Sequence, residues 1–208
     1  MAHYAKIENN LKRIAIEPEL NNALHNFWIF KNELDANTCK KIINLGSKKW
    51  IDATVKATGQ DIVNLNERKT NVFFSNDSWL FDIASSYMKK ANENSNWNFE
   101  ISAAETMQVT KYKKGDYYNF HYDGNGFTKI DTPKNKLTHG KTRKLSMTII
   151  LNEDYEGGEF EFFSHPDLIK EKKGTIIVFP SYMEHRVRPI TKGTRYSLVV
   201  WFVGEPFK

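Results

Sequence analysis

The feature that most restricts the fold of this chain is a series of short strand-like segments in its second half. From residue 97 onward, apolar and polar side chains alternate over short runs, and turn signals that contain glycine separate the runs. Many short strands at this spacing are typical of a sandwich or barrel of antiparallel sheets. The predicted strands cover residues 105–112, 117–123, 144–151, 159–163, 175–179, 185–189 and 196–203.

The first half of the chain predicts two strands and two helices. Aromatic runs at residues 27–30 and 70–74 indicate strands. Asp35 can cap a helix that carries its apolar residues on one face. Asp77 or Ser78 can cap a second helix with the same spacing of apolar residues. We therefore expect a mostly β fold with flanking helices.

The length of 208 residues fits one domain with a substantial core. Residues 1–26 are polar and lack a clear period, so we expect an N-terminal extension followed by a single domain over residues 27–208. The polar segment 124–142 contains no strand signal. Loops of this length are often functional, so we expect a mobile loop there that orders over bound substrate.

His121 and Asp123 are two residues apart at the end of a predicted strand. Side chains at this spacing leave a strand on the same face, so both can converge on one point. His185 follows after several more strands and can complete a set of two imidazoles and one carboxylate. Such a set leaves coordination positions open on a metal and suits non-haem Fe(II) and oxygen chemistry. These three residues are the predicted metal ligands and the predicted catalytic centre.

Arg195 follows the last of these ligands and is the predicted anchor for a cosubstrate. A planar guanidinium can grip the far carboxylate of a dicarboxylic acid whose other end chelates the metal. An arginine in a Lys-Gly-Thr-Arg turn can equally lie on the surface. Tyr112 and Tyr118 can point into the same cavity as hydrogen-bond donors or can be core residues. Ser146 and Thr148 share one strand face, where their hydroxyls can line the pocket or belong to an ordinary strand.

Charge and cysteine content exclude several classes of protein. Lys+Arg 30 against Asp+Glu 25 gives a formal net charge of +5, spread along the chain without a block of like charges, which does not call for a nucleic-acid partner. Cys39 is the single cysteine, so the sequence permits no internal disulfide and no cysteine-rich metal site. No apolar run is long enough to span a bilayer. We expect a cytoplasmic protein without a membrane partner, and the sequence leaves the oligomeric state open.

Several motifs follow one another in a fixed order between residues 105 and 198. They are Glu105-Thr-Met-Gln108, Tyr112-x-x-Gly115-x-x-Tyr118-x-x-His121-x-Asp123, Arg143-Lys-Leu-Ser-Met-Thr-Ile-Ile-Leu-Asn152, Tyr155-Glu-Gly-Gly-Glu159, Gly174-Thr-x-x-x-Phe-Pro-Ser181 and His185-Arg-Val-x-Pro-x-Thr-x-Gly-x-Arg195-Tyr-Ser-Leu. The ordered set resembles the prolyl 4-hydroxylase-like branch of the Fe(II)/2-oxoglutarate dioxygenases, particularly the PKHD-type hydroxylases of bacteria and phages. The resemblance covers roughly residues 27–202.

The resemblance implies a double-stranded β-helix, or jelly roll, with helices packed on its major sheet. It implies iron on the three predicted ligands, 2-oxoglutarate held by Arg195, and a contact from Tyr112 to this cosubstrate. Tyr118 and Ser146 are further candidate contacts to the cosubstrate. Ser146 stands where many relatives carry threonine. Ile150 stands where several animal relatives carry a tyrosine, so one contact to 2-oxoglutarate found in them is absent here.

The resemblance also implies an activity, namely hydroxylation of a C–H bond with O2, release of succinate and CO2, and ascorbate (vitamin C) as a candidate further cofactor. Peptidyl proline in a protein or peptide is the favoured substrate, and a free amino acid or another protein side chain stays open. Oxidative repair of alkylated nucleic acid is a rival reaction, but those relatives carry a second arginine six residues after the first, where this chain has Trp201. A non-catalytic jelly-roll binding module is the remaining alternative.

Overall fold

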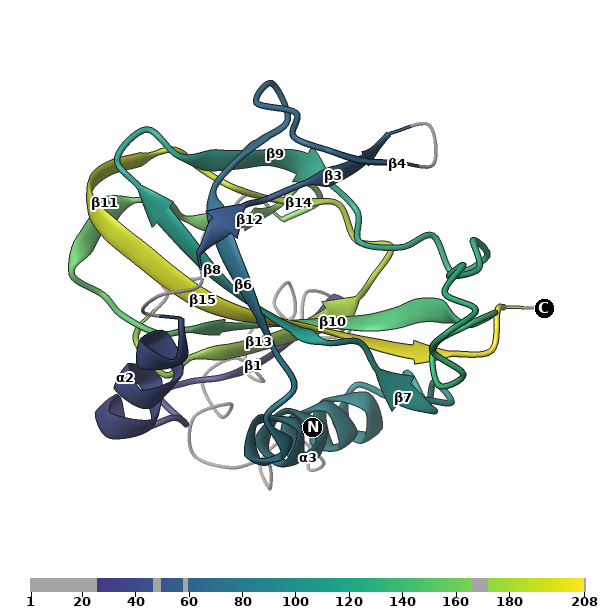
Figure 1. Ribbon diagram of the computed structural model, residues 1–208. Helices are drawn as coiled ribbons and strands as arrows, with labels where there is room; N and C mark the ends of the chain where they lie inside the picture. Colours follow the sequence, from purple (N-terminus) through teal and green to yellow (C-terminus); the bar gives the residue numbers. More distant parts are fainter. Residues whose placement is uncertain (1–25, 47–49, 58–59, 166–171, 208) are drawn as a thin grey trace.

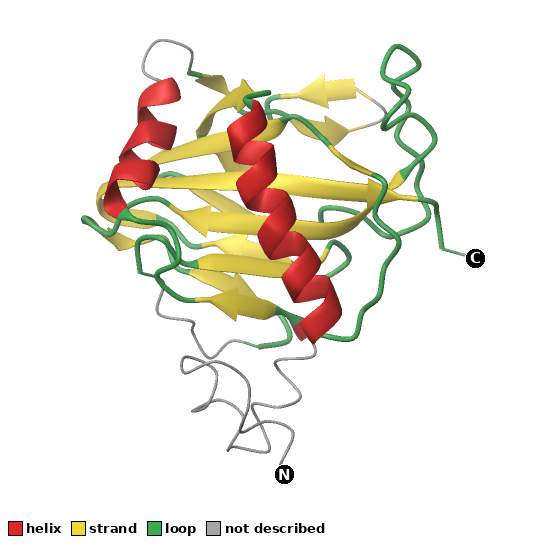
Figure 2. Cartoon of the chain, turned by 90° about the horizontal axis from the view of Figure 1, so that it is seen from below, coloured by secondary structure: helices red, strands yellow, loops and turns green. Residues whose placement is uncertain are grey.

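Two antiparallel sheets face each other, and two helices cover the outer face of the larger sheet (Figures 1 and 2). This computed structural model describes residues 26–46, 50–57, 60–165 and 172–207. The major sheet runs in the order β1 (Trp28–Phe30), β13 (Ile176–Pro180), β10 (Thr142–Ile150), β15 (Ile190–Gly204), β8 (Met107–Lys113), β6 (Asn71–Ser75) and β2 (Ile51–Asp52), with β7 (Ala103–Ala104) and β11 (Tyr155–Gly157) paired to β15. The minor sheet runs β12 (Phe160–Phe162), β14 (His185–Val187), β9 (Tyr117–His121) and β5 (Arg68–Lys69), while β3 (Val55–Ala57) and β4 (Gln60–Ile62) form a separate pair. The predicted sandwich of antiparallel sheets is confirmed.

The first helix, α2 (Ala36–Leu45), begins where the sequence predicted. The Asp35 carboxylate accepts hydrogen bonds from the main-chain N–H groups of Asn37 and Thr38, at 2.8 and 3.0 Å, and so satisfies two donors that the helix leaves unpaired. Cys39 and Ile42 are its buried residues and face the major sheet. The cap therefore sets the start of the helix, and the apolar face sets the side that packs.

The second helix, α3 (Ser78–Asn94), buries one stripe on the major sheet beside α2. Its buried residues recur at helical spacing and are Leu80, Ala84, Met88 and Ala91. They join a core with Met147 of β10 and Val200 of β15, both fully buried. Burying a large aliphatic side chain contributes about 1.5–3 kcal/mol, so this core fixes the helices on the outer face and leaves the inner face to the second sheet.

A second, aromatic core fills the space between the two sheets. Phe160 and Phe162 of the minor sheet contact Phe179 of the major sheet, with ring centroids 5.6 and 5.1 Å apart. Phe162 also stacks on Phe27, at 4.8 Å. These rings close one end of the space between the sheets and border His185 on β14.

Some elements differ from the sequence prediction. β15 begins at Ile190, where the predicted strand began at residue 196, because the chain pairs with β11 before it reaches β8. The polar stretch 51–70 contains β2 to β5, which are too short to show a period in the sequence. The predicted extension at residues 1–26 falls almost entirely outside the described residues. Neither helix in the described ranges is long and apolar enough to cross a bilayer.

The loop over residues 124–142 contains no strand before β10 begins, as predicted, and hydrogen bonds within it close a turn. The N–H of Ile130 donates to the carbonyl of Lys141 at 2.8 Å, and the N–H of Gly140 donates to the carbonyl of Ile130 at 2.9 Å. The N–H of Phe207 donates to the carbonyl of Gly126 at 3.0 Å and ties the loop to the last described residues. Ordering of this loop over substrate stays a prediction.

Replacement of Gly174 by alanine is expected to destabilise the fold strongly. Gly174 precedes β13 with φ +81°, and a Cβ there would overlap the carbonyl of Leu34. The left-handed conformation costs a non-glycine residue about 1–2 kcal/mol, and forcing an atom into packed backbone costs about 1–3 kcal/mol more. The free energy of unfolding in urea is therefore expected to fall by roughly 2–5 kcal/mol.

Gly115 supplies a matched control for this measurement. Its φ is +82°, but nothing lies within 4 Å of a Cβ built on it. Gly115→Ala should carry the conformational cost alone, about 1–2 kcal/mol. Equal losses for the two variants would show that the contact with Leu34 is unimportant.

Candidate active site

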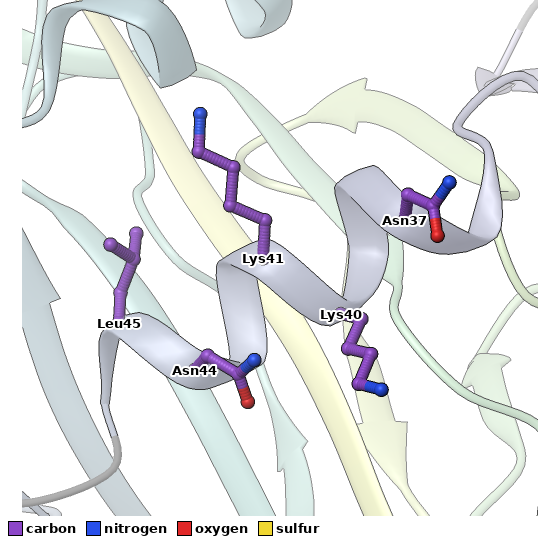
Figure 3. A pocket seen from close by; sticks show the side chains of 5 residues that line it. All are labelled: Asn37, Lys40, Lys41, Asn44 and Leu45. Atoms are coloured by element: carbon purple, nitrogen blue, oxygen red, sulfur yellow. The ribbon is translucent and has the colours of Figure 1, made fainter.

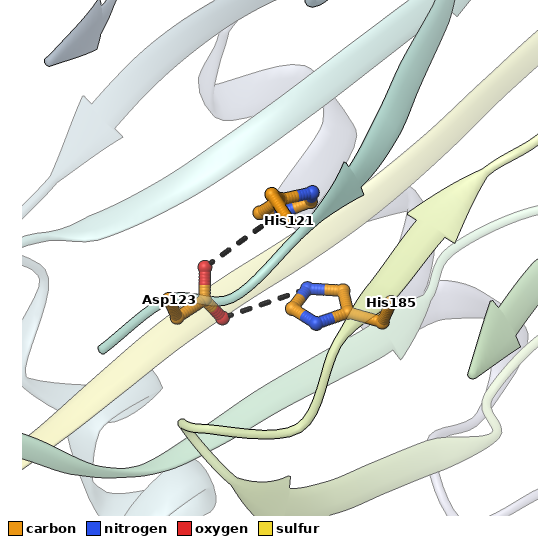
Figure 4. Close-up of side chains that lie close together, drawn as sticks. All are labelled: His121, Asp123 and His185. Carbon is orange, nitrogen blue, oxygen red and sulfur yellow. Dashed lines mark ion pairs between the residues drawn. The ribbon is translucent and has the colours of Figure 1, made fainter. Parts of the chain in front are cut away.

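Two histidines and one aspartate converge between the sheets (Figure 4). His121 at the end of β9 and His185 at the start of β14 are cross-strand partners, so the minor sheet holds the two imidazoles side by side. Asp123 Oδ1 lies 3.8 Å from His121 Nε2, and its Oδ2 lies 3.7 Å from His185 Nε2. One ligand atom from each residue lies within 4.8 Å of the others. The structure thus brings together the residues predicted as metal ligands.

The strand predicted to carry both His121 and Asp123 is shorter than expected. β9 ends at His121, and Asp123 lies in a bend two residues further on. The main-chain N–H groups of Asp123 and Gly124 both donate to the carbonyl oxygen of Ser181, each at 3.0 Å. The two ligands therefore converge through this bend and not through alternation along a strand.

Hydrogen bonds to the imidazoles leave their inward nitrogens available to a metal. His121 Nδ1 lies 2.8 Å from the main-chain oxygen of Asn119, and His185 Nδ1 lies 2.9 Å from that of Met183. Since a carbonyl oxygen only accepts, Nδ1 carries the proton in each ring and Nε2 presents its lone pair. Metal-binding histidines are commonly fixed in this way. The donor set of two imidazoles and one carboxylate fits Fe(II).

Burial and neighbouring charges favour the protonation states that metal binding needs. The side chains of His121, Asp123 and His185 are 10%, 7% and 6% exposed. Burial, and then the neighbouring His185, lower the pKa of His121 to about 3, so its ring is neutral at pH 7. Burial alone would raise the pKa of Asp123, but the two histidines and Arg143 lower it below its ordinary value. Neutral imidazole and ionised carboxylate are the forms that bind metals.

Arg195 lines the same cavity from the major sheet. It is 0% exposed, and its Nη1 donates to Ser197 Oγ at 2.9 Å. Ser197 Oγ in turn lies 2.6 Å from Thr110 Oγ1 on β8, so two hydroxyls help to orient the guanidinium. Tyr112 pairs with Arg195 in register, and its ring centroid lies 5.7 Å from the guanidinium carbon. Arg195 is therefore no surface turn residue, and these donors fit a carboxylate group.

Tyr118, predicted as a cosubstrate contact, stacks directly on a predicted metal ligand. Its ring centroid lies 3.4 Å from that of His121, and the Arg68 guanidinium carbon lies 4.6 Å from the same phenol ring. Burial raises the pKa of Tyr118, so its hydroxyl stays protonated. Tyr118 lines the cavity, and its contact with a cosubstrate stays a prediction.

Ser146 lies beside the Asp123 carboxylate and is not among the residues that line the cavity. It is fully buried, and its Oγ lies 2.9 Å from Ser181 Oγ. Its neighbour on the same strand face, Thr148, lines the cavity together with Arg195. A contact between Ser146 and the cosubstrate therefore also stays a prediction. Of the two hydroxyls on this strand face, that of Thr148 belongs to a residue that lines the cavity.

Sequence reasoning missed several residues of the cavity wall. Thr110 lies two residues before Tyr112 and Ser197 two residues after Arg195, so strand alternation from the predicted residues could have found both. Arg68 lies on the short strand β5, in a stretch that gave no strand signal. The polar and aromatic cavity residues not predicted from the sequence are Arg68, Gln108, Thr110, Phe160, Phe179, Ser197 and Trp201.

A shallow hollow of about 400 Å³ lies along α2, on the opposite face of the major sheet from the minor sheet (Figure 3). It is lined by Asn37, Lys40, Lys41, Asn44 and Leu45. These side chains include no carboxylate and no imidazole, so the hollow offers no metal ligands of the kind found between the sheets.

Known proteins with similar sequences and structures indicate the family of this chain. Residues 107–203 match the family described as the 2OG-Fe(II) oxygenase superfamily. A PKHD-type hydroxylase of Aliarcobacter butzleri is 30% identical over 174 residues, which cover 78% of this chain and 70% of that protein. A PKHD-type hydroxylase of Idiomarina loihiensis is 32% identical over 99 residues, which cover 46% of this chain and 40% of that protein.

A viral collagen prolyl hydroxylase from Paramecium bursaria chlorella virus-1, solved as its 2OG complex, has a similar fold. The TM-score is 0.64 at 20% identity, and the match covers 86% of this chain and 96% of that one. This likeness confirms the predicted jelly roll with helices on the major sheet. The chain spans only 40–42% of the length of three of the PKHD-type relatives. The extent of the match to the Aliarcobacter butzleri relative nevertheless shows that the chain belongs to the 2OG-Fe(II) oxygenase superfamily.

Proposed function

We propose that this chain is an Fe(II)- and 2-oxoglutarate-dependent hydroxylase. The observation that carries the proposal is one cavity lined by two imidazoles, one carboxylate and a buried guanidinium. When bound, the iron supplies O2 activation that is coupled to conversion of 2-oxoglutarate to succinate and CO2 and places one oxygen atom in a substrate C–H bond. The non-catalytic alternative is disfavoured because every predicted ligand and Arg195 are present in the cavity.

The residues of this chain have separate tasks in the proposal. His121, Asp123 and His185 would hold the metal and leave coordination positions open for 2-oxoglutarate and O2. Arg195 would hold the far carboxylate of 2-oxoglutarate by paired hydrogen bonds, with Tyr112 beside it. The surrounding aromatic rings would keep water from the reacting atoms.

We propose peptidyl proline as the substrate. The support is the resemblance to PKHD-type hydroxylases and the fold shared with a viral collagen prolyl hydroxylase. A free amino acid or another protein side chain would need the same metal chemistry. Alkylated nucleic acid is disfavoured because Trp201 stands at the place of the second arginine, and its ring packs 4.0 Å from the Arg143 guanidinium carbon.

The proposal includes a catalytic domain over residues 27–208 after an N-terminal extension, and a cytoplasmic location. The location rests on the single cysteine, Cys39, which is free and buried. Ascorbate is a further candidate cofactor by resemblance alone.

The purified chain is expected to release succinate from 2-oxoglutarate when Fe(II) and O2 are present, and to add one oxygen atom to a proline-containing peptide. Succinate would be quantified by chromatography and the peptide by mass spectrometry. The controls are the Asp123→Ala variant and the same peptide with alanine in place of each proline. Free amino acids and an alkylated oligonucleotide are tested in the same assay as alternative substrates.

Each result of this assay has a defined meaning. Oxygen gain only in the proline peptide supports the full proposal. Succinate release with oxygen gain in one of the alternative substrates supports the proposed hydroxylase and shows that its substrate is not peptidyl proline. No succinate in any arm, with metal bound, would favour the non-catalytic module.

A further inference from the structure

The three predicted metal ligands are held by different means. His121 and His185 belong to paired strands, so sheet hydrogen bonds fix both imidazoles. Asp123 lies beyond β9 in a bend and has no sheet ladder to hold it. A carboxylate on a bend can rotate or shift with its main chain unless other groups fix it, so its placement must come from outside the minor sheet.

Hydrogen bonds fix the main chain of Asp123 from both sides. Its N–H donates to the carbonyl of Ser181 at 3.0 Å, and its carbonyl accepts a hydrogen bond from Arg143 Nη1 at 3.1 Å. The next residue, Gly124, runs directly against Arg143, because a Cβ on Gly124 would lie 2.9 Å from Arg143 Cβ. Arg143 therefore holds the chain at the point where it leaves the metal site.

Arg143 is itself fixed on two further sides. Its Nε and Nη2 donate to the two carboxylate oxygens of Glu105, at 2.5 and 2.9 Å, in a bidentate pair. Its guanidinium carbon lies 4.0 Å from the ring centroid of Trp201 on β15. A planar guanidinium held along one edge by a carboxylate and packed against an aromatic ring keeps a single orientation. The remaining nitrogen, Nη1, is then aimed at the Asp123 carbonyl.

We infer that Arg143, oriented by Glu105, is the positioning residue of the Asp123 ligand. Arg143 touches the main chain of Asp123 and acts on the metal site through it. The inference rests on the proposed metal site. Lysine at position 143 would keep the charge but could not donate to Glu105 and to the Asp123 carbonyl with the same fork.

The test measures Mn(II) binding to the full chain by electron paramagnetic resonance, without 2-oxoglutarate and without turnover. Arg143→Lys and Glu105→Gln are each expected to weaken Mn(II) affinity by about 10–100-fold, the usual effect of losing a partner that orients a metal ligand. Because the two residues act as a unit, the double variant should lose little more than either single variant. Thermal unfolding without metal shows whether each variant folds.

The chain offers a control in a second Arg–Glu contact. Arg188 Nε donates to Glu161 at 2.6 Å, and Glu161 also accepts from Arg186 at 2.8 Å. The Arg188 side chain is more exposed than that of Arg143, so Arg188→Lys should lower thermal stability less and leave Mn(II) affinity near that of the unchanged protein. A purely structural role of Arg143 would give the same pattern as Arg188, with lower stability and unchanged metal affinity.

The outcomes separate this inference from the proposed function. If His121→Ala abolishes Mn(II) binding while Arg143→Lys and Glu105→Gln keep full affinity, the metal site stands and the positioning role is wrong. If His121→Ala also keeps full affinity, the metal site itself is wrong and the positioning role falls with it. If a variant at 143 or 105 does not fold, Gly124→Ala provides the same test, because its Cβ presses on Arg143 and leaves every charge in place.

Discussion

Replacement of His121 or Asp123 by alanine is expected to abolish tight binding of Fe(II) or Mn(II). Each residue supplies one of three converging ligand atoms. Loss of an outer partner already weakens a metal site by about 10–100-fold, so loss of a ligand itself should exceed that range. Titration of Mn(II) into the purified variants, followed by calorimetry, measures the change. The rates of hydroxylation and of succinate release should fall together with the metal affinity.

His139→Ala is the matched control for the metal measurement. The side chain of His139 is 48% exposed in the loop before β10, and its Nδ1 lies 3.8 Å from Asp131 Oδ1. Removing this imidazole should leave metal affinity unchanged. Full affinity in both the His121→Ala and Asp123→Ala variants would contradict the assignment of the metal site.

Replacement of Arg195 by alanine is expected to raise the apparent KM for 2-oxoglutarate by at least about 30-fold. Removing one partner of a buried, hydrogen-bonded charge pair costs about 2–5 kcal/mol, and each 1.4 kcal/mol is roughly tenfold in affinity. Arg195→Lys should be intermediate, because the charge survives and the paired donors do not. Succinate release at varied 2-oxoglutarate concentration gives the KM of each variant.

Metal affinity measured without cosubstrate distinguishes the role of Arg195 from that of the metal ligands. Fe(II) affinity of Arg195→Ala should stay near that of the unchanged protein, since Arg195 lies on the opposite sheet from the histidines. Lys192→Ala, an exposed change on the same strand, is the control. An unchanged KM in Arg195→Ala would mean that another residue anchors the cosubstrate.

Local signals in the sequence were sufficient to predict helices with a capping residue and strands with a clear pattern of apolar residues. Asp35 predicted the first residue of α2, and its carboxylate does cap that helix. The apolar residues of 144–151 and 175–179 predicted strands, and these are β10 and β13 of the structure. Such elements follow from neighbours in the sequence, so local reasoning reaches them.

The parts that local reasoning missed depend on contacts between distant segments. Asp123 leaves β9 because Ser181, far along the chain, accepts two hydrogen bonds from the bend. Arg68 lines the cavity on a strand of two residues that pairs with β9, which is distant in the sequence. The role of Arg143 needed Glu105 and Trp201 in place. No local spacing or propensity contains this information.

The pairing of His121 with His185 also sets when the metal site can form during folding. The two residues lie far apart in the sequence, and pairing of such distant strands is slow because a long loop must close first. The complete ligand set therefore exists only after the minor sheet has closed. A metal ion cannot act as a folding nucleus here and instead binds the finished structure. Added metal should accordingly slow unfolding far more than it speeds folding.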